Sequence, residues 1–300
     1  AAETLQRYKN AKASLERRII EDEEFWKLRH WDYLRRKKDK SGDSMQPVSA
    51  WLFNSLINKH ADIMDNYPEV HCLPREESDQ QDATALSSII PVVLSRNEFE
   101  KTYSDAAWYK IKHGTSCFGA FWNKDLENGL GDIDIRDIDL LNIFWEPGIT
   151  DIQDSKNLFI VDLVDDDTLK ELYPDKKIRG TSRVIEVADY IYDDTVDTGN
   201  KSVVVDWYYK VRDITGKTVL HYVKFVGDTV LFASENEEEY RNGWYEHGTY
   251  PVVFDVLYPE AGTPYGYGII SVAKDPQLYI DKLDACILKH SLMKATPRWF

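Results

Sequence analysis

The spacing of apolar residues changes near His113-Gly114, and this change divides the chain. Before it, apolar residues recur at spacings of three and four, which is typical of amphipathic helices. After it, apolar and polar residues alternate as far as about residue 257, which is typical of half-buried strands. A last helical stretch covers residues 269–295. The pattern therefore predicts an α+β chain whose strands occupy its middle.

The first 112 residues predict three helices. The first covers residues 3–38, the second follows Ser49 as its N-cap, and the third covers residues 82–112. Pro68 should stop the second helix, and Pro91 should bend or break the third. The residues expected on the apolar faces of these helices are Leu15, Ile19, Trp26 and Tyr33, then Phe53, Ile57, Ala61 and Met64, then Leu86, Ile90, Val93, Asn97, Ala107 and Ile111.

The middle of the chain predicts short strands bounded by turn residues, with a hairpin at Gly227-Asp228 and one short helix over residues 167–173. The strands are expected at residues 116–122, 132–139, 158–164, 184–192, 203–211, 219–226, 229–233 and 252–257. Residues 258–268 form a loop rich in Gly, Pro and Tyr, and the helix after it could restart at Asp275-Pro276. In that helix Lys282 and Lys289 are seven residues apart and therefore share a face.

Composition narrows the classes of function. The 300 residues carry 37 Lys and Arg against 52 Asp and Glu, a net charge of −15. This balance argues against a protein that wraps DNA with a basic face, and against one drawn to anionic lipid. No run of 18 apolar residues occurs, so no membrane span is expected. Three separated cysteines predict no disulfide framework, and 13% aromatic residues suit large interfaces as well as cores.

The clustered carboxylates Asp132, Asp134, Asp137 and Asp139 raise the question of a metal or catalytic site. Because they alternate with apolar residues, we interpret them as the solvated face of a strand and expect no metal there. The chain has no paired Cys or His motif, no nucleophile elbow and no phosphate-binding loop. We therefore nominate no catalytic residue, metal ligand or cofactor. A glycoside hydrolase with paired carboxylates, or a β-rich carbohydrate-binding protein, remains the alternative.

Four segments occur in a familiar order. Together they resemble the portal proteins, or head-to-tail connectors, of tailed bacteriophages. The first segment is the helix from Tyr8 to Trp26 together with the later helix stop Asp65-Asn66-Tyr67-Pro68, and the second is the helix-to-strand junction from Ala106 through His113-Gly114 to Phe121. The third runs from Asp139 to Gly148 and is followed by the strand 158–164 and the helix 169–174. The fourth is Pro264-Tyr265-Gly266-Tyr267-Gly268, which precedes a helix with Gln277 and Asp281. Pro91 and Pro276 depart from the uninterrupted helices that the family would have there.

The resemblance implies a structural protein without catalytic activity. It implies a ring of twelve subunits at one capsid vertex of the virion, assembled in the host bacterial cytoplasm. Double-stranded DNA would pass through the ring during packaging and ejection. The implied partners are the terminase large subunit, a head–tail adaptor, scaffolding protein and the major capsid protein, with no membrane involved.

The resemblance also suggests a division of the chain. Residues 1–112 would be the helical N-terminal part of the wing, residues 113–257 its β-rich region, and residues 258–300 a loop and the first stem helix leading toward the clip. We expect the chain to be the N-terminal part of a longer portal protein. In the stem helix, Leu283 and Ile287 should contact adjacent subunits. Lys282 and Lys289 should face either the DNA channel or outer solvent.

Overall fold

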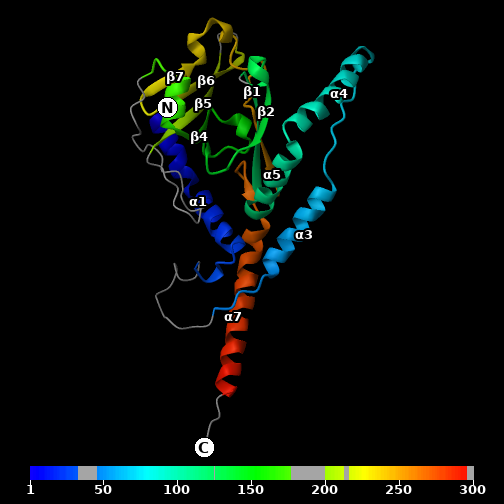
Figure 1. The fold of residues 1–300 in the computed structure, drawn as a ribbon, viewed down its shortest axis with the longest axis vertical. Helices are drawn as coiled ribbons and strands as arrows, with labels where there is room; N and C mark the ends of the chain where they lie inside the picture. Colours follow the sequence, from blue (N-terminus) through cyan, green and yellow to red (C-terminus); the bar gives the residue numbers. More distant parts are fainter. Residues whose placement is uncertain (33–45, 125, 177–199, 213–215, 296–300) are drawn as a thin grey trace, which may run out of the picture. The chain divides into compact units, whose positions relative to one another are not determined.

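The structure is a computed structural model that describes residues 1–32, 46–124, 126–176, 200–212 and 216–295 (Figure 1). The chain divides into two compact units, each built from segments that are far apart in the sequence. Unit 1 contains Ala1–Glu16, Cys117–Phe254 and Pro259–Tyr265, and unit 2 contains Arg17–Ser116, Asp255–Tyr258 and Gly266–Phe300. Helices and strands together confirm the α+β class. The strand expected at residues 184–192 lies outside the described residues.

Unit 1 is built on a five-stranded sheet with the order β3-β4-β5-β6-β7. All neighbouring strands are antiparallel, and β6 joins β7 through the expected turn at Gly227-Asp228. The strands predicted at residues 158–164, 203–211, 219–226 and 229–233 are confirmed, and β3 is an addition that the alternation did not reveal. The strands are β3 (Ile143–Trp145), β4 (Asn157–Asp165), β5 (Lys201–Arg212), β6 (Thr218–Val226) and β7 (Thr229–Ala233).

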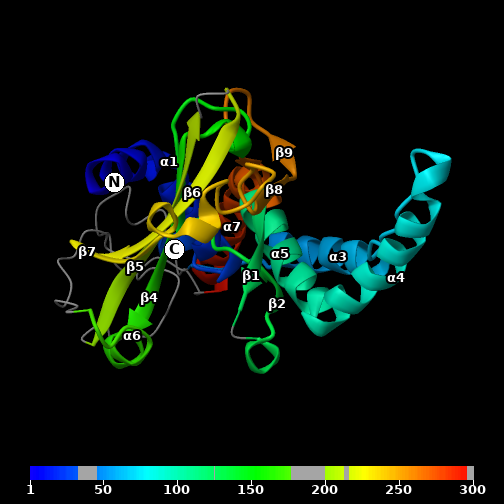
Figure 2. The same cartoon turned by 90° about the horizontal axis from the view of Figure 1, so that it is seen from above.

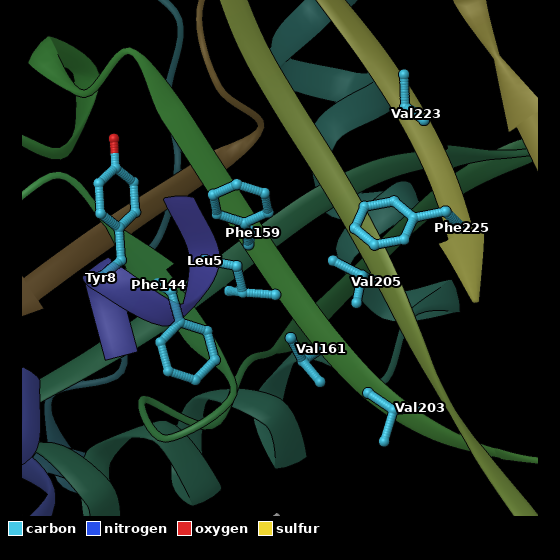
Figure 3. Close-up of a cluster of buried hydrophobic side chains, with 9 residues drawn as sticks. All are labelled: Leu5, Tyr8, Phe144, Phe159, Val161, Val203, Val205, Val223 and Phe225. Atoms are coloured by element: carbon cyan, nitrogen blue, oxygen red, sulfur yellow. The ribbon is translucent and has the colours of Figure 1, made fainter. Parts of the chain in front are cut away.

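Both faces of this sheet are covered, and its strands β4 and β5 carry near-continuous runs of buried residues, as strands buried on both faces do. One face packs against Leu5 and Tyr8 from the start of α1 (Ala2–Trp26), as Figure 3 shows. The opposite face packs against Leu169 of α6 (Asp166–Leu172), the short helix that the sequence predicts. The cluster on the first face contains Leu5, Tyr8, Phe144, Phe159, Val161, Val203, Val205, Val223 and Phe225.

A smaller sheet has the order β2-β1-β8, formed by β1 (Thr115–Asn123), β2 (Asp132–Asp137) and β8 (Val252–Val256). The expectation of a half-buried strand over residues 132–139 is wrong in two respects. The strand ends at Asp137, and Ile133 is exposed opposite Trp122, which is also exposed. The alternation there does not make a buried face, because none of the elements that the structure describes covers the outer part of this hairpin. Two short strands, β9 (Tyr258–Pro259) and β10 (Gly266–Tyr267), pair within the predicted loop.

Unit 2 is helical. Its elements include the second part of α1, α3 (Trp51–Asp65), α4 (Gln80–Arg96), α5 (Phe99–His113) and α7 (Ile269–Ala295). Helices α3, α5 and α7 pack around one core, whereas α4 extends away from them (Figures 1 and 2). The buried residues of this core are Phe25, Leu52, Leu56, Ile111, Ile270 and Leu278.

The first helix is shorter than predicted. Helix α1 ends at Trp26 rather than continuing toward residue 38. The N–H of Arg29 donates to Glu24 O (2.9 Å), and the N–H of Leu28 donates to Phe25 O (3.1 Å). With Leu28 at φ 58°, these two bonds form a Schellman motif, which usually has Gly at the Leu28 position. The sequence pattern therefore gave no stop signal here.

Three details of the other helices also differ from prediction. Ser49 is not the N-cap of α3, since Ala50 occupies that position and no side chain caps the helix. The inward face of α3 is formed by Leu52 and Leu56, so the predicted face containing Ile57 is displaced by one residue. The third predicted helix breaks at Glu98, which has φ 48°, and not at Pro91, which lies inside α4.

Helix α7 matches the predicted range and runs without a restart through Pro276. Proline cannot donate to the carbonyl four residues earlier, here that of Val272. Both Pro276 and Val272 are exposed. The carbonyl without a helical donor therefore lies on the exposed side of α7, where the break in the hydrogen-bond pattern costs least.

Candidate functional site

Helix α7 is the candidate functional element because two of its faces have different characters. As far as Asp284 one face is buried within unit 2 and contributes Ile270 and Leu278 to the helical core, whereas residues 286–294 are exposed on all sides. The opposite face carries large apolar side chains that are exposed. These follow spacings of four, three, four and four residues and form an exposed stripe: Val272, Pro276, Tyr279, Leu283 and Ile287.

The buried face is held by a polar network centred on Asp281, which is fully buried. Its Oδ1 accepts hydrogen bonds from the N–H of Ser49 (2.9 Å) and from Nε2 of Gln277 (3.0 Å). Its Oδ2 lies 2.6 Å from Nδ1 of His30, which is also buried. The other ring nitrogen of His30 lies 3.3 Å from Phe25 O, so both nitrogens of the imidazole face acceptors.

Gln277 completes the network. Its Nε2 also donates to Ser49 O (2.7 Å), and its Oε1 accepts the N–H of Leu52 (3.0 Å) at the start of α3. The Ser49 hydroxyl donates to Asp284 Oδ2 (2.6 Å). Gln277, Asp281 and Asp284 thus join α7 to the segment before α3 and to the turn after α1. Because hydrogen bonds are directional, this network fixes the rotation of α7 and therefore which side chains form its exposed stripe.

Ion pairs fix the first two turns of α7 to α1. Ser271 donates to Asp22 Oδ2 (2.6 Å), and Lys274 Nζ lies 3.2 Å from Glu21 Oε2. Burial raises the pKa of the Asp22 carboxyl, an effect that the Ser271 hydrogen bond and the Lys274 charge partly offset.

The neighbouring Glu23 behaves in the opposite way. Burial would raise its pKa, but His113 and Lys112 outweigh that effect and lower the pKa to about 2. The Lys112 Nζ lies 2.8 Å and the His113 Nε2 3.3 Å from Glu23 Oε2. Glu23 is therefore ionised and joins α1 to the end of α5 across the neutral pH range.

Two glycines allow the entry into α7 to cross the end of α5 at backbone contact. A Cβ on Gly114 would lie 2.1 Å from the Tyr267 carbonyl carbon, and one on Gly268 would lie 2.2 Å from Lys112 O. Gly114 also has φ 91°, in the region that favours glycine. These glycines belong to two of the segments that carry the family resemblance. Their contact explains why both segments need glycine at these positions.

The site residues named from the sequence are all exposed on α7. Leu283 and Ile287 lie in the exposed stripe, each about three-fifths exposed. Lys282 and Lys289 share a face beside the stripe, and Lys282 Nζ lies 5.6 Å from the centre of the Tyr279 ring. Their roles at a subunit contact or a DNA channel stay predictions.

Sequence reasoning did not give the buried network a role. Gln277 and Asp281 were named only as part of the fourth segment that resembles portal proteins, and Ser49 was predicted to be the N-cap of the second helix. One signal was available: Gln277 and Asp281 are polar and four residues apart, on the same face as the apolar residues Ile270 and Leu278. The partner His30 follows a turn without a glycine, so no local pattern marked it.

The carboxylates considered for a metal lie in and just after the outer strand of the small sheet. Asp132 Oδ1 accepts the N–H of Ile133 (2.7 Å), and Asp139 Oδ1 accepts the N–H of Leu141 (2.9 Å). Within the described ranges, no group of three or more His, Cys, Asp or Glu side chains is arranged to hold a metal ion. Among the helices that the structure describes, none is both long enough and apolar enough to cross a membrane.

A comparison with protein families adds the deciding observation. The family model described as phage P22-like portal protein matches residues 3–283. The chain belongs to this family. It is a bacteriophage portal protein, a head-to-tail connector that acts in DNA packaging. The family is structural rather than enzymatic, and its members work as oligomeric rings with capsid and packaging partners. A search of curated proteins found no match to this portal protein.

Proposed function

We propose that this portal protein forms a closed ring of twelve subunits at one vertex of the capsid, with α7 beside the central channel. Double-stranded DNA passes through the channel during packaging and again during ejection. The ring binds the terminase large subunit while the head fills and the tail adaptor afterwards. Scaffolding protein and the major capsid protein are its partners during assembly in the bacterial cytoplasm.

The observation that carries the proposal is the exposed stripe on α7. An apolar stripe with this spacing on an exposed helix is typical of a helix that packs against other helices. The polar network around Asp281 holds the opposite face, so α7 presents the stripe in one orientation. In a ring, the α7 helices of adjacent subunits cover the stripe, with Leu283 and Ile287 at its centre.

In this arrangement the sequence divides into functional parts. Residues 1–112 form the helical N-terminal part of the wing, residues 113–257 its β-rich region, and residues 258–300 the loop and first stem helix before the clip.

The charge of the chain suits a channel that lets DNA slide. A net charge of −15 per subunit repels phosphate, so the channel wall does not bind DNA tightly. Lys282 and Lys289 would then supply weak contacts that salt screens. They share one face of α7 outside the apolar stripe, as such a role requires.

We predict that Lys282→Ala with Lys289→Ala leaves ring assembly and melting temperature nearly unchanged but lowers the amount of DNA packaged or ejected. Exposed lysines change the free energy of unfolding by no more than about 0.5 kcal/mol. The measurement is DNA packaged per particle in a reconstituted reaction, together with the mass of the ring. Lys101→Ala is the control, since Lys101 is an exposed lysine of α5 and lies outside the exposed stripe of α7. Normal DNA transport by the double variant would place the two lysines in outer solvent, and failure to form rings would place them at the subunit contact.

A further inference from the structure

The second exposed apolar region of unit 2 is helix α4 with the extended segment before it, residues 68–96, here called the α4 limb. In Figures 1 and 2 the limb extends away from the packed helices α3, α5 and α7. Its apolar side chains point outward over both parts. Leu73 is 85% exposed, Ile89 54% and Val92 53%. Val70 and Leu86 are also exposed.

The sequence of α4 is unusual for a helix in water. From Ala83 to Ser95 it has no charged residue, although charged residues make up 30% of the chain. Leu86, Ile89 and Val92 follow one another at spacings of three and so form one outward stripe. The inward face is made by other residues, among them Ala83, which is buried.

The hydroxyl groups of α4 are bonded within the limb. Thr84 donates to Gln80 O (2.8 Å) and Ser88 to Thr84 O (3.0 Å), one turn back in the same helix. The Ser87 hydroxyl accepts the N–H of Cys72 (2.9 Å) and donates to Cys72 O (3.2 Å). Because these hydroxyls donate to backbone carbonyls of the limb, a partner could exclude water from α4 without leaving their hydrogen bonds unmade. The surface of α4 from Ala83 to Leu94 therefore suits burial, whereas the charged residues of the limb lie before and after it.

We propose that the α4 limb docks against the neighbouring copy of this chain, as a second subunit contact separate from α7. This proposal rests on the ring of the proposed function. Copies with a charge of −15 repel one another, and this repulsion is weakest where the surfaces in contact carry little charge. The α4 stripe is such a surface. DNA is a poor occupant, because no cationic side chain lies between Asp82 and Arg96.

A limb that reaches the neighbouring subunit gives a contact of the head-to-tail kind, which closes into a ring when the rotation per subunit is a whole fraction of a full turn. The two contacts would lie at different distances from the channel. The α7 stripe packs helices around the channel, and the limb joins each subunit to the next farther from it.

The test uses the full-length protein and measures the concentration at which half of it is assembled, by mass photometry. The double variant Ile89→Glu with Val92→Glu should raise that concentration at least tenfold while the isolated subunit unfolds as the wild type does. Leu172→Glu is the matched control, since Leu172 is an exposed leucine of helix α6; it should leave assembly unchanged. Rings that form equally well in the double variant and the wild type would overturn the limb contact alone. A wild-type protein that forms no ring would overturn the proposed function, and the limb contact with it.

A second measurement identifies the occupant. Cysteine placed at the exposed Ser88, in a background with Cys72→Ser and Cys286→Ser, should react with a maleimide at least tenfold more slowly in rings than in isolated subunits. Equal reaction rates would contradict the proposal. So would protection that occurs only after scaffolding or capsid protein is added, because the occupant would then be that protein and not a second copy.

Discussion

Replacing Asp281 by alanine is expected to lower the free energy of unfolding by about 3–5 kcal/mol, the usual cost of breaking a buried ion pair. The substitution leaves the Ser49 N–H, the His30 ring and the Gln277 amide without their shared acceptor. Since whole domains are stable by only about 5–15 kcal/mol, a loss of this size should melt unit 2 near room temperature or slightly above. Urea unfolding and amide hydrogen exchange in α3 and α7 measure it.

Asp275→Ala is the matched control for Asp281→Ala. Asp275 lies on the same helix but is exposed, so its removal should change the free energy of unfolding by about 0.5 kcal/mol or less. Asp281→Asn should give an intermediate loss, because the amide oxygen can still accept one N–H while the charge opposite His30 is gone. Equal stability of the two alanine variants would show that the network does not hold α7.

Leu283→Glu with Ile287→Glu is expected to abolish ring assembly while the isolated subunit folds normally. Each side chain is about three-fifths exposed in the single chain, so the substitutions cost little there. In the ring each loses about 1.5–3 kcal/mol of apolar burial, and each new carboxylate would be desolvated as well. Two such losses at every contact weaken association by at least a hundredfold, at about 1.4 kcal/mol for each factor of ten.

The readout for this pair is particle mass as a function of protein concentration, with circular dichroism to verify the fold. Leu172→Glu adds the same charge at a leucine of similar exposure outside α7 and should assemble as the wild type does. Rings formed normally by the double variant would mean that the α7 stripe is not the subunit contact.

How far the sequence predicts this fold depends on where each signal comes from. Periodicity is local, so it predicted α7 over its whole length, and β4, β5, β6 and β7 with small shifts at their ends. The end of α1 could not be predicted, because Leu28 occupies a left-handed position that normally belongs to glycine. The break at Glu98 was missed for the same reason, and Pro91 drew attention to the wrong residue.

Long-range pairing accounts for the rest. Ser49 was predicted to be a helix cap from its local sequence alone. Its hydrogen-bond partners, Asp281 and Asp284, are more than 200 residues away, so local sequence could not reveal them. Lys12, within the first segment of the family resemblance, was given no role from the sequence. It is buried, donates to Leu140 O and Ile143 O, and burial lowers its pKa to about 8. For the candidate site, the exposed stripe of α7 was partly predicted through Leu283 and Ile287, whereas the polar network that orients it appears only in the folded chain.

An image of the assembled full-length protein by electron cryomicroscopy is the most direct test of the proposed ring. We expect a closed ring in which every subunit places α7 beside the central channel, with Leu283 and Ile287 covered by the neighbouring subunit. A protein that stays a monomer or a small oligomer under all assembly conditions would contradict it. So would a ring in which α7 lies at the outer rim.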